Sequence, residues 1–260
     1  MISVLHLGQL DFATALKLQG RLVELRKEGR IGDVLLLLEH TPVITLGRNA
    51  KEKNILASPE ELVRRGVEVF DTNRGGDVTF HGPGQLVGYP IFDLRGYALP
   101  DGKRKTLGAV DYVRRLEEVL IRTCADFRIS TKRVAGLTGV WTEVETGDEA
   151  KIAAIGVHIS HFVTSHGFAL NVNTDLSYFD LIVPCGIEDK PVTSMSKELG
   201  KHVDSGAVAE ALSRNFGTVF QSQMLWLETL DALLGPQVGV PVKAPEELRK
   251  LHGDDSSAWA

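Results

Sequence analysis

The chain has very little cysteine: among 260 residues, only Cys124 and Cys185 occur. Two cysteines far apart exclude the disulfide framework of a small secreted domain and the Cys/His spacing of a tetrahedral zinc site. A chain of this length buries enough apolar surface to fold without such cross-links. We therefore expect no disulfide, no metal and a reducing compartment, the cytoplasm.

Long apolar runs and an excess of positive charge are also missing. The longest apolar run, Val34 to Leu38, is far shorter than the roughly 20 residues that span a bilayer, and the N-terminal MISVLHLGQLDF lacks the build of a signal peptide. The 29 lysines and arginines against 34 acidic residues give a net charge of −5, which provides no general attraction to nucleic acid. We expect neither a membrane nor a nucleic acid as partner, and at most a local basic patch at Lys103–Lys105, Arg48 and Lys51.

The sequence does contain an alternation of helix and strand patterns, without an internal repeat. Apolar stripes, caps and breakers predict helices over residues 11–28, 59–65, 107–127 and 205–220. Apolar and β-branched runs predict strands over 2–7, 33–39, 43–46, 67–70, 86–92, 138–144, 151–159 and 162–170. The consecutive leucines of 33–39 are typical of a strand covered on both faces. The fold class that follows is α/β (α+β), a single domain with a large mixed β-sheet flanked by helices.

The predicted catalytic domain covers residues 1–225, and residues 226–260 form a C-terminal extension. Pro236, Pro241 and Pro245 follow the last predicted helix, and the chain then ends in an acidic, serine-containing stretch. Such ends are loosely held, so we expect this extension to be partly flexible.

Three segments carry residues suited to chemistry, and the first is the glycine-rich stretch RGGDVTFHGPGQ at 74–85. Glycine lets a backbone approach a ligand closely, and exposed N–H groups in such a loop bind anions or carbonyl groups. A turn-rich hairpin is the structural alternative, but Arg74 and His81 favour a binding site. The spacing matches neither the dinucleotide fingerprint nor the phosphate-binding P-loop, so we infer no nucleotide.

The second segment, LIVPCGI at 181–187, presents Cys185 between proline and glycine. These neighbours favour a sharp, accessible turn, so the thiol is a candidate nucleophile if its pKa falls below the usual value of about 8.5. A structural cysteine is the alternative. Cys124 lies on the apolar face of the predicted helix 107–127, and we interpret it as core packing.

The third segment, KIAAIGV at 151–157, opens an apolar strand with Lys151. Its ammonium either reaches water from the strand end or, at a buried site, stabilises a thiolate and accepts a proton when neutral. His158, His161 and His166 follow, but no carboxylate-rich pattern accompanies them. We interpret these histidines as polar sheet or loop residues rather than metal ligands.

Taken together, these segments resemble the octanoyltransferases of lipoate biosynthesis, also called lipoyl(octanoyl) transferases. The matching stretches are RGGDVTFHGPGQLVGYPIFDL at 74–94, KIAAIGVHI at 151–159, HGFALNVNTDL at 166–176 and IVPCGI at 182–187. They occur in the family's order, and the resemblance covers about residues 30 to 220. It implies the catalytic-domain fold of the biotin and lipoate protein ligases.

The resemblance also implies a two-step acyl transfer that needs no cofactor. Cys185 matches the family's nucleophile, which takes the octanoyl group from octanoyl-acyl carrier protein as a thioester. Lys151 matches the family's lysine, which lowers the thiol pKa and deprotonates the incoming amine. The implied acceptors are lysines of apo lipoyl domains, in 2-oxoacid dehydrogenases and the glycine cleavage H protein. The residues that match the family's substrate-binding segments are Arg74, Gly75, Gly76, Asp77, Val78, Thr79, Phe80, His81, Ala154, Ile155, Gly156, Gly167, Phe168 and Ala169.

Such a transfer needs oxyanion donors and an apolar tunnel. Two aimed N–H groups stabilise the oxyanion, and we expect them near Gly82–Gly84 or at Gly156. Each buried methylene of the acyl chain contributes about 0.8 kcal/mol, so the end of the tunnel sets the preferred chain length. Leu86–Tyr89 and Phe168–Leu170 are the expected lining. Because acyl carrier proteins are acidic, docking requires the local basic patch named above.

Three other functions compete with this hypothesis. An ATP-dependent lipoate or octanoate ligase on the same fold activates its acid as an adenylate and needs no nucleophilic cysteine, so Cys185 favours the transferase. A protein that binds lipoyl domains without turnover would keep its function without the thiol. A cysteine hydrolase would pass the acyl group to water, but no histidine and carboxylate relay accompanies Cys185 in these segments.

Overall fold

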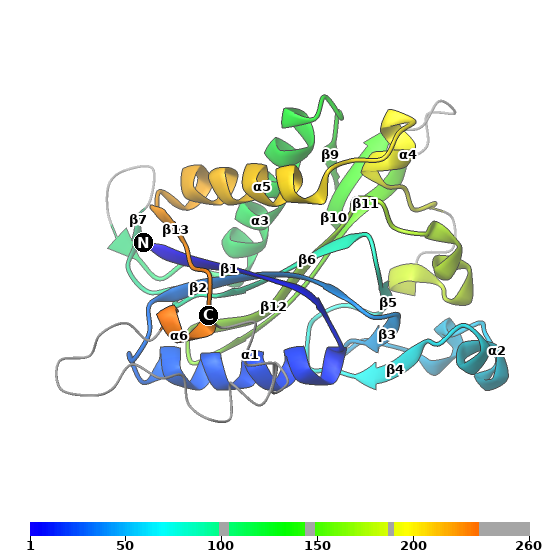
Figure 1. Cartoon of the computed structure of the whole chain (residues 1–260), viewed down its shortest axis with the longest axis horizontal. Coiled ribbons are helices and arrows are strands. Elements are labelled where there is room, and N and C mark those ends of the chain that lie inside the picture. Colours follow the sequence, from blue (N-terminus) through cyan, green and yellow to red (C-terminus); the bar gives the residue numbers. More distant parts are fainter. Residues whose placement is uncertain (99–103, 144–148, 187–189, 234–260) are drawn as a thin grey trace.

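Helices and strands alternate along the chain in the computed structural model, which describes residues 1–98, 104–143, 149–186 and 190–233 (Figure 1). Within these ranges the strands are β1 (Ile2–Leu10), β2 (Asp33–His40), β3 (Val43–Leu46), β4 (Glu68–Asp71), β5 (Val78–His81), β6 (Gln85–Ile91), β7 (Tyr97–Ala98), β8 (Arg104–Lys105), β9 (Lys132–Val134), β10 (Leu137–Glu143), β11 (Glu149–Ser160), β12 (Val163–Asn171) and β13 (Met224–Trp226). The α-helices are α1 (Phe12–Lys27), α2 (Pro59–Arg64), α3 (Ala109–Asp126), α4 (Met195–Leu199), α5 (Ser205–Phe220) and α6 (Leu230–Leu233), and three 3₁₀ turns are η1 (Glu52–Asn54), η2 (Leu176–Leu181) and η3 (Pro184–Gly186).

One large mixed sheet organises the described part of the chain, in the order β13-β1-β2-β6-β12-β11-β10-β9. Strand β1 pairs in parallel with both β13 and β2, whereas β2–β6, β6–β12, β12–β11 and β11–β10 are antiparallel. A smaller sheet, β4-β3-β5, lies beside it. The predicted fold class, α/β with a large mixed sheet flanked by helices, is confirmed.

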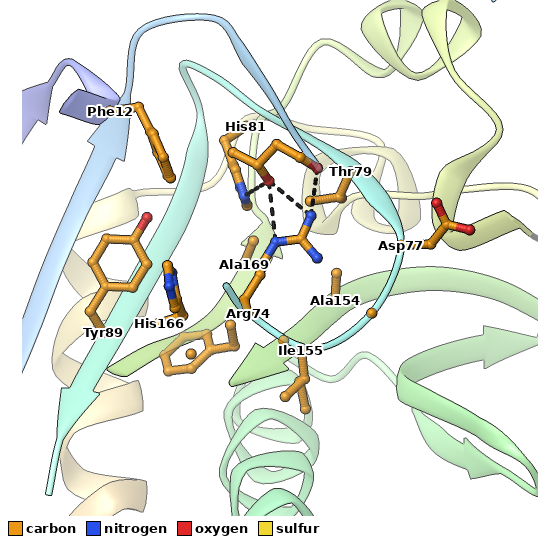
Figure 2. A pocket seen from close by; sticks show the side chains of 15 residues that line it. Phe12, Arg74, Asp77, Thr79, His81, Tyr89, Ala154, Ile155, His166 and Ala169 are labelled. Carbon is orange, nitrogen blue, oxygen red and sulfur yellow. Dashed lines mark hydrogen bonds between the residues drawn. The ribbon is translucent and has the colours of Figure 1, made fainter. Parts of the chain in front are cut away.

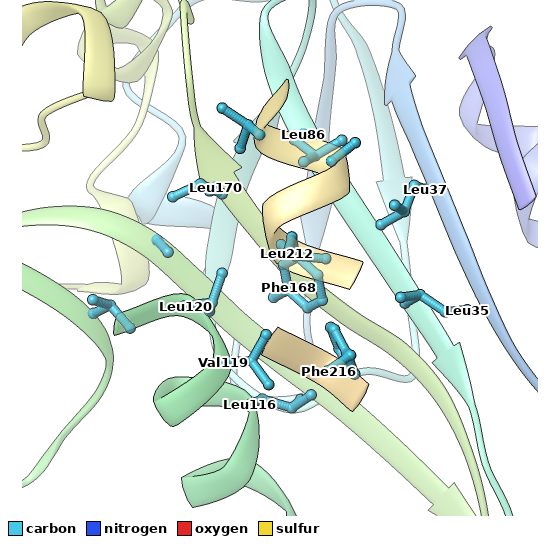
Figure 3. Packing of buried hydrophobic residues seen from close by; sticks show 14 of the residues in the cluster. Leu35, Leu37, Leu86, Leu116, Val119, Leu120, Phe168, Leu170, Leu212 and Phe216 are labelled. Carbon is cyan, nitrogen blue, oxygen red and sulfur yellow. The ribbon is translucent and has the colours of Figure 1, made fainter. Parts of the chain in front are cut away.

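Helices cover both faces of the large sheet (Figure 1). The leucines of β2 alternate between the two sides, with Leu36 packed in the cluster under α1 and Leu37 in the cluster under α3 and α5. Figure 3 shows this second cluster, in which Leu116 of α3 and Phe216 of α5 lie over the sheet. Because helices bury both faces of the sheet at β2, this strand has a continuous apolar sequence, as predicted.

Side-chain caps set several helix starts where the sequence predicts them. Asp11 accepts a hydrogen bond from the Thr14 N–H at 2.8 Å, and Ser58 accepts one from the Glu61 N–H at 3.2 Å. Each cap satisfies an N–H group that has no partner inside its helix. The observed α1 and α5 therefore agree with the predicted helices to within one residue at each end.

The glycine-rich stretch contains a strand that the sequence analysis missed. The prediction treated 74–85 as a loop, but Val78–His81 forms β5 and pairs antiparallel with β3. Four residues between glycines are too few for a clear alternating pattern, and only the partner strand makes them extended. Likewise, Val43–Leu46 is a strand as predicted but belongs to the small sheet.

A β-bulge interrupts β11 next to its charged end. Val140 pairs with Ala153, but the next residue, Trp141, pairs with Lys151, so Ile152 is an extra residue on β11. A bulge of this kind changes which face the following side chains occupy. Consequently Ile152 and Ala153 both pack in the core under α3 and α5. Strict alternation would instead place Lys151 on the same face as Ala153.

The end of the described chain returns to the first strand. Strand β13 pairs with β1, and Leu230 of α6 is buried in the cluster under α1. The division between a domain at 1–225 and an extension at 226–260 stays a prediction. Residues 144–148, between the predicted strands 138–144 and 151–159, and the proline-containing end within 234–260 lie outside the described residues.

Core packing against α3 gives the first testable prediction. Leu116 is fully buried, so Leu116→Ala should lower the free energy of unfolding by about 2–5 kcal/mol through lost apolar burial and a residual cavity. Val110 on the same helix is 72% exposed, and Val110→Ala should change it by at most about 0.5 kcal/mol. Urea unfolding followed by circular dichroism measures both. Equal losses would contradict the packing described here.

Candidate active site

A cavity opens between the small sheet and the face of the large sheet that α1 covers. We call it the central cavity. Figure 2 shows Phe12, Tyr89 and His166 on one side of it and Asp77 on the other, with Arg74 between them. The residues that line it are Phe12, Thr45, Arg74, Gly76, Asp77, Thr79, His81, Tyr89, Ala154, Ile155, Gly156, His166, Gly167, Phe168 and Ala169.

Most of the residues that the sequence assigns to substrate binding lie on this cavity. The exceptions are Gly75, Val78 and Phe80. Because side chains alternate along β5, Thr79 and His81 face the cavity, whereas Val78 and Phe80 pack in a separate apolar cluster beneath the small sheet. Gly75 instead uses its backbone, donating its N–H to the Val157 carbonyl at 2.9 Å.

Several lining residues were missed or assigned another role. Phe12 and Thr45 come from α1 and β3, which carry no recognisable pattern for binding. His166 was interpreted as a polar sheet or loop residue. Of the expected tunnel segments, Tyr89 and Phe168 line the cavity. Leu86 packs in the core instead. Nothing in the sequence shows that α1 and β3 reach the site, since those contacts are tertiary.

A second, smaller cavity adjoins the first, and we call it the lysine cavity. Its lining residues are Thr79, Gln85, Lys151, Ala154, Ala169, Asn171, Phe179, Pro184 and Val192. Thr79, Ala154 and Ala169 line both cavities, so these three residues form the boundary that the two share. Lys151 shares this side with Ala154 despite the odd spacing, because the bulge at Ile152 reverses the alternation.

The turn η3, which contains Cys185, reaches the lysine cavity through Pro184. Pro184 lines that cavity, and the Gly186 N–H donates to the Val183 carbonyl at 3.0 Å. Gly186 has φ 67°, and a Cβ there would lie 2.8 Å from the Asp77 carboxylate, so glycine is favoured at this turn. The Cys185 side chain and residues 187–189 lie outside the described part of the structure.

The other cysteine is a core residue, as predicted. Cys124 is fully buried on α3. Burial raises the pKa of the Cys124 thiol to about 12. A thiol in this state is a poor nucleophile near neutral pH.

A directional chain of hydrogen bonds starts at Arg74, which is buried beside the central cavity. Its Nη2 donates to the Thr45 carbonyl at 2.6 Å and to Thr45 Oγ1 at 2.9 Å. Thr45 Oγ1 lies 3.4 Å from His81 Nε2, and His81 Nδ1 lies 2.7 Å from Gln85 Oε1. An amide oxygen only accepts, so His81 carries its proton on Nδ1 and accepts from Thr45 at Nε2.

The chain continues from Gln85 to the strand of Lys151. Gln85 Nε2 donates to the Phe80 carbonyl at 3.2 Å and to Asn171 Oδ1 at 2.9 Å. Asn171 Nδ2 donates to the Thr193 carbonyl at 2.9 Å, and the Thr193 N–H donates to the Lys151 carbonyl at 2.9 Å. Donors therefore point in one direction from the guanidinium to the backbone of Lys151. These side chains hold fixed orientations next to both cavities.

Two buried histidines, His81 and His166, line the central cavity, and the ring of a third, His40, lies 5.8 Å from that of His81. Burial, the neighbouring His40 and the Arg74 charge lower the pKa of His81 to about 3. Burial lowers the pKa of His40 to about 4, and burial with the Arg74 charge does the same for His166. His40 accepts a hydrogen bond at Nε2 from the Tyr89 hydroxyl at 2.6 Å because its Nδ1 donates to the Leu10 carbonyl. All three rings are neutral near pH 7.

The structure describes parts of two further expected features, an oxyanion donor and the basic patch. The Gly84 N–H donates to the Glu39 carboxylate at 2.9 Å, so it is not available as an oxyanion donor. In the expected basic patch, the exposed Arg48 contacts His158 at 2.7 Å, and Lys51 is exposed. Residue 103 and the side chains of 104 and 105 lie outside the described residues.

No group of three or more His, Cys, Asp or Glu side chains in the described ranges is arranged to hold a metal ion. Nor is any described helix long and apolar enough to span a bilayer.

Comparison with known proteins gives matches over nearly the whole chain. The model of the lipoyl protein ligase A/B catalytic domain matches residues 11–217. Proteins named octanoyltransferase are 63% identical in Koribacter versatilis, over 98% of both chains, and 60% identical in Acidobacterium capsulatum, over 90% of this chain and 96% of the relative.

Solved structures show the same fold at low sequence identity. P. falciparum LipL1 in complex with lipoate superposes with a TM-score of 0.67 at 12% identity, over 97% of this chain and 71% of that one. A lipoate-protein ligase A bound with ATP gives 0.63 at 15% identity, over 97% and 93% of the two chains. At these identities the likeness establishes the fold alone.

The buried histidines predict how stability depends on pH. The unfolded chain binds protons at histidine near pH 6.5, whereas the folded rings bind them only near pH 3 to 4, so stability falls as the pH drops from 6.5 toward 4. Urea unfolding between pH 7 and 5 measures this slope. In His81→Gln the slope should decrease by about 1 kcal/mol per pH unit on average between pH 7 and 5, approaching about 1.4 kcal/mol per unit near pH 5. His202→Gln changes an exposed residue and should leave the slope of stability against pH unaltered. Equal slopes in the two variants would show that His81 is not the source of the pH dependence.

Proposed function

The chain belongs to the lipoyl protein ligase A/B catalytic domain family and, like its curated relatives, is an octanoyltransferase of lipoate biosynthesis; we propose that it carries the octanoyl group as a thioester on Cys185. The donor is octanoyl-acyl carrier protein. The acceptor is a lysine of an apo lipoyl domain, such as those of 2-oxoacid dehydrogenases and the glycine cleavage H protein. The single observation that supports this most directly is that Lys151 and Pro184, the residue before Cys185, line one cavity.

The two adjoining cavities support binding of a medium-length acyl chain. The reacting carbonyl lies in the lysine cavity, and the methylenes extend past Ala154 and Ala169 into the central cavity. Phe12 and Ala169 offer apolar surface there. Each methylene buried against such surface contributes about 0.8 kcal/mol to binding. Arg74 and His81 sit beside this path with their polar atoms engaged by hydrogen bonds.

The chemistry proceeds in two balanced steps. The Cys185 thiolate attacks the octanoyl carbonyl carbon, the bond to the carrier's sulfur breaks, and the carrier leaves as a thiol after taking a proton. The neutral amine of the acceptor lysine then attacks the acyl-enzyme, and the Cys185 thiolate leaves. The Lys151 ammonium stabilises the thiolate in the first step. It gives a proton to the leaving carrier, and its amine then takes one from the acceptor nitrogen.

The partners and the location follow from the same hypothesis. Both partners are proteins that present their reacting group on a flexible arm or an exposed lysine, so neither needs to enter the cavity as a whole. The exposed Arg48 and Lys51 are the described part of the basic patch proposed for the acidic carrier. The cytoplasm remains the predicted compartment.

An acyl-enzyme assay tests the function. Incubation with octanoyl-acyl carrier protein, without ATP, should add one octanoyl group to the chain, located on Cys185 by peptide mass spectrometry. Cys185→Ala should remain unlabelled, whereas Cys124→Ala should be labelled fully, since that thiol is buried in the core. Labelling that requires ATP and free octanoate would establish the ligase instead. Release of octanoate to water without a lipoyl domain would establish a hydrolase.

The role of the lysine has its own test. Lys151→Met should raise the pKa of the Cys185 thiol by about one unit or more, because a neighbouring positive charge is removed. The pH profile of iodoacetamide alkylation at Cys185, measured peptide by peptide, reports that pKa. Lys197→Met, an exposed lysine on α4, is the control and should leave the profile unchanged. An unshifted profile in Lys151→Met would disprove electrostatic coupling between the two residues.

A further inference from the structure

The indole ring of Trp141 lies against the ammonium of Lys151. The distance from Lys151 Nζ to the centre of the Trp141 ring system is 4.7 Å, within the range of cation–π attraction. Both residues are buried, Trp141 at 1% exposure and Lys151 at 6%. An ammonium in such surroundings has little contact with water, so the face of the ring replaces part of its lost hydration.

The strand register creates this contact. Trp141 on β10 stands directly opposite Lys151 on β11, immediately beside the bulge at Ile152. Gly139, two residues earlier, has φ 127°, and a Cβ there would lie 2.7 Å from the Ala153 carbonyl and 3.4 Å from Lys151 Cε. A side chain at 139 would therefore clash with the Ala153 carbonyl and touch the lysine stem. The bulge, the glycine and the ring together set the course of the Lys151 side chain.

Side-chain packing and the strand register, rather than a hydrogen bond, position the Trp141 ring. Trp141 Nε1 has no hydrogen-bond partner among the described residues, although most buried indole N–H groups have one. A second ammonium, that of Lys190, lies 5.9 Å from the same ring but forms an ion pair with Glu149. Lys190 therefore has a carboxylate as its main electrostatic partner. Lys151 is the more buried of the two lysines and lines the lysine cavity.

We propose that Trp141 is a positioning residue of the transferase, which holds the Lys151 ammonium by a cation–π contact at the lysine cavity. This inference rests on the proposed roles of Cys185 and Lys151. The π face stabilises the charged form of the lysine and restricts its rotamers. The ammonium thereby stays near the nucleophile during thioester formation. The acceptor amine then meets a lysine whose nitrogen is already in place.

Substitutions at Trp141 test the proposal through the pH profile of Cys185 alkylation. Trp141→Leu should move the profile to higher pH by about half a unit to one unit, since the thiolate loses a fixed positive neighbour. Its kcat should fall about 10- to 100-fold, with KM for octanoyl-acyl carrier protein changed less than about threefold. Trp141→Phe keeps an aromatic face and should restore most of both properties.

The control separates positioning from simple loss of packing. Tyr112 is an equally buried aromatic residue on α3, outside both cavities. Tyr112→Leu should lower stability without moving the alkylation profile. If Lys151→Met shifts the profile and Trp141→Leu does not, the inference fails while the proposed function stands. If neither variant shifts it, the electrostatic role proposed for Lys151 fails as well, and the acyl-enzyme assay alone decides the role of Cys185. A Tyr112→Leu shift equal to that of Trp141→Leu would also overturn the inference.

A spectroscopic measurement applies even if Trp141→Leu does not fold. The chain has three tryptophans, so Trp226→Phe with Trp259→Phe leaves Trp141 as the single indole. In that background, Lys151→Met should shift the Trp141 emission maximum, because a charge near the ring perturbs its excited state. Lys197→Met should leave the emission unchanged. An identical emission maximum before and after Lys151→Met would overturn the contact.

Discussion

One extra residue in β11 determines how the whole site is arranged. Without the bulge at Ile152, the strand would direct Lys151 into the apolar core under α3 and α5, on the side away from both cavities. With it, Lys151 joins Ala154 on the face that carries both cavities. The apolar residue at the bulge fills the core on one side while the charged residue reaches the site on the other. A single strand thus serves packing and chemistry at once.

Sequence reasoning identified much of this molecule where information is local. The Asp11 and Ser58 caps and the two-sided burial of β2 follow from neighbouring residues, and so they were predictable. The lining role of Thr79 was implied by family resemblance. What could not be predicted is tertiary: β5 is a strand because β3 pairs with it, and Phe12 reaches the cavity because α1 crosses that face. The bulge is also invisible, because the sequence KIAAIGV suits a regular strand equally well.

The interior around the cavities contains polar side chains. Hydrogen bonds fix their orientations, and the buried histidines carry no charge. The chain from Arg74 through His81 and Gln85 to Asn171 leaves each amide and imidazole one orientation, since every link has a fixed donor and acceptor. Burial keeps the histidines neutral, so Arg74 is the permanent charge among them. Such a network holds the walls of both cavities in fixed positions. The same burial makes the fold sensitive to acid, because protonation would place a positive charge on the buried imidazole rings.

The pairing of β13 with β1 places the amino terminus next to one edge of the large sheet, and β1 lies four strands away from β11. At a strand spacing of about 4.8 Å, β1 is roughly 19 Å from Lys151 across the sheet. A lipoyl domain tethered genetically to Met1 would therefore need a flexible Gly/Ser linker of about 12 residues or more before its lysine could reach the lysine cavity. Shorter linkers would favour transfer between molecules. Fusions of graded linker length would therefore measure the distance from the amino terminus to the reacting site.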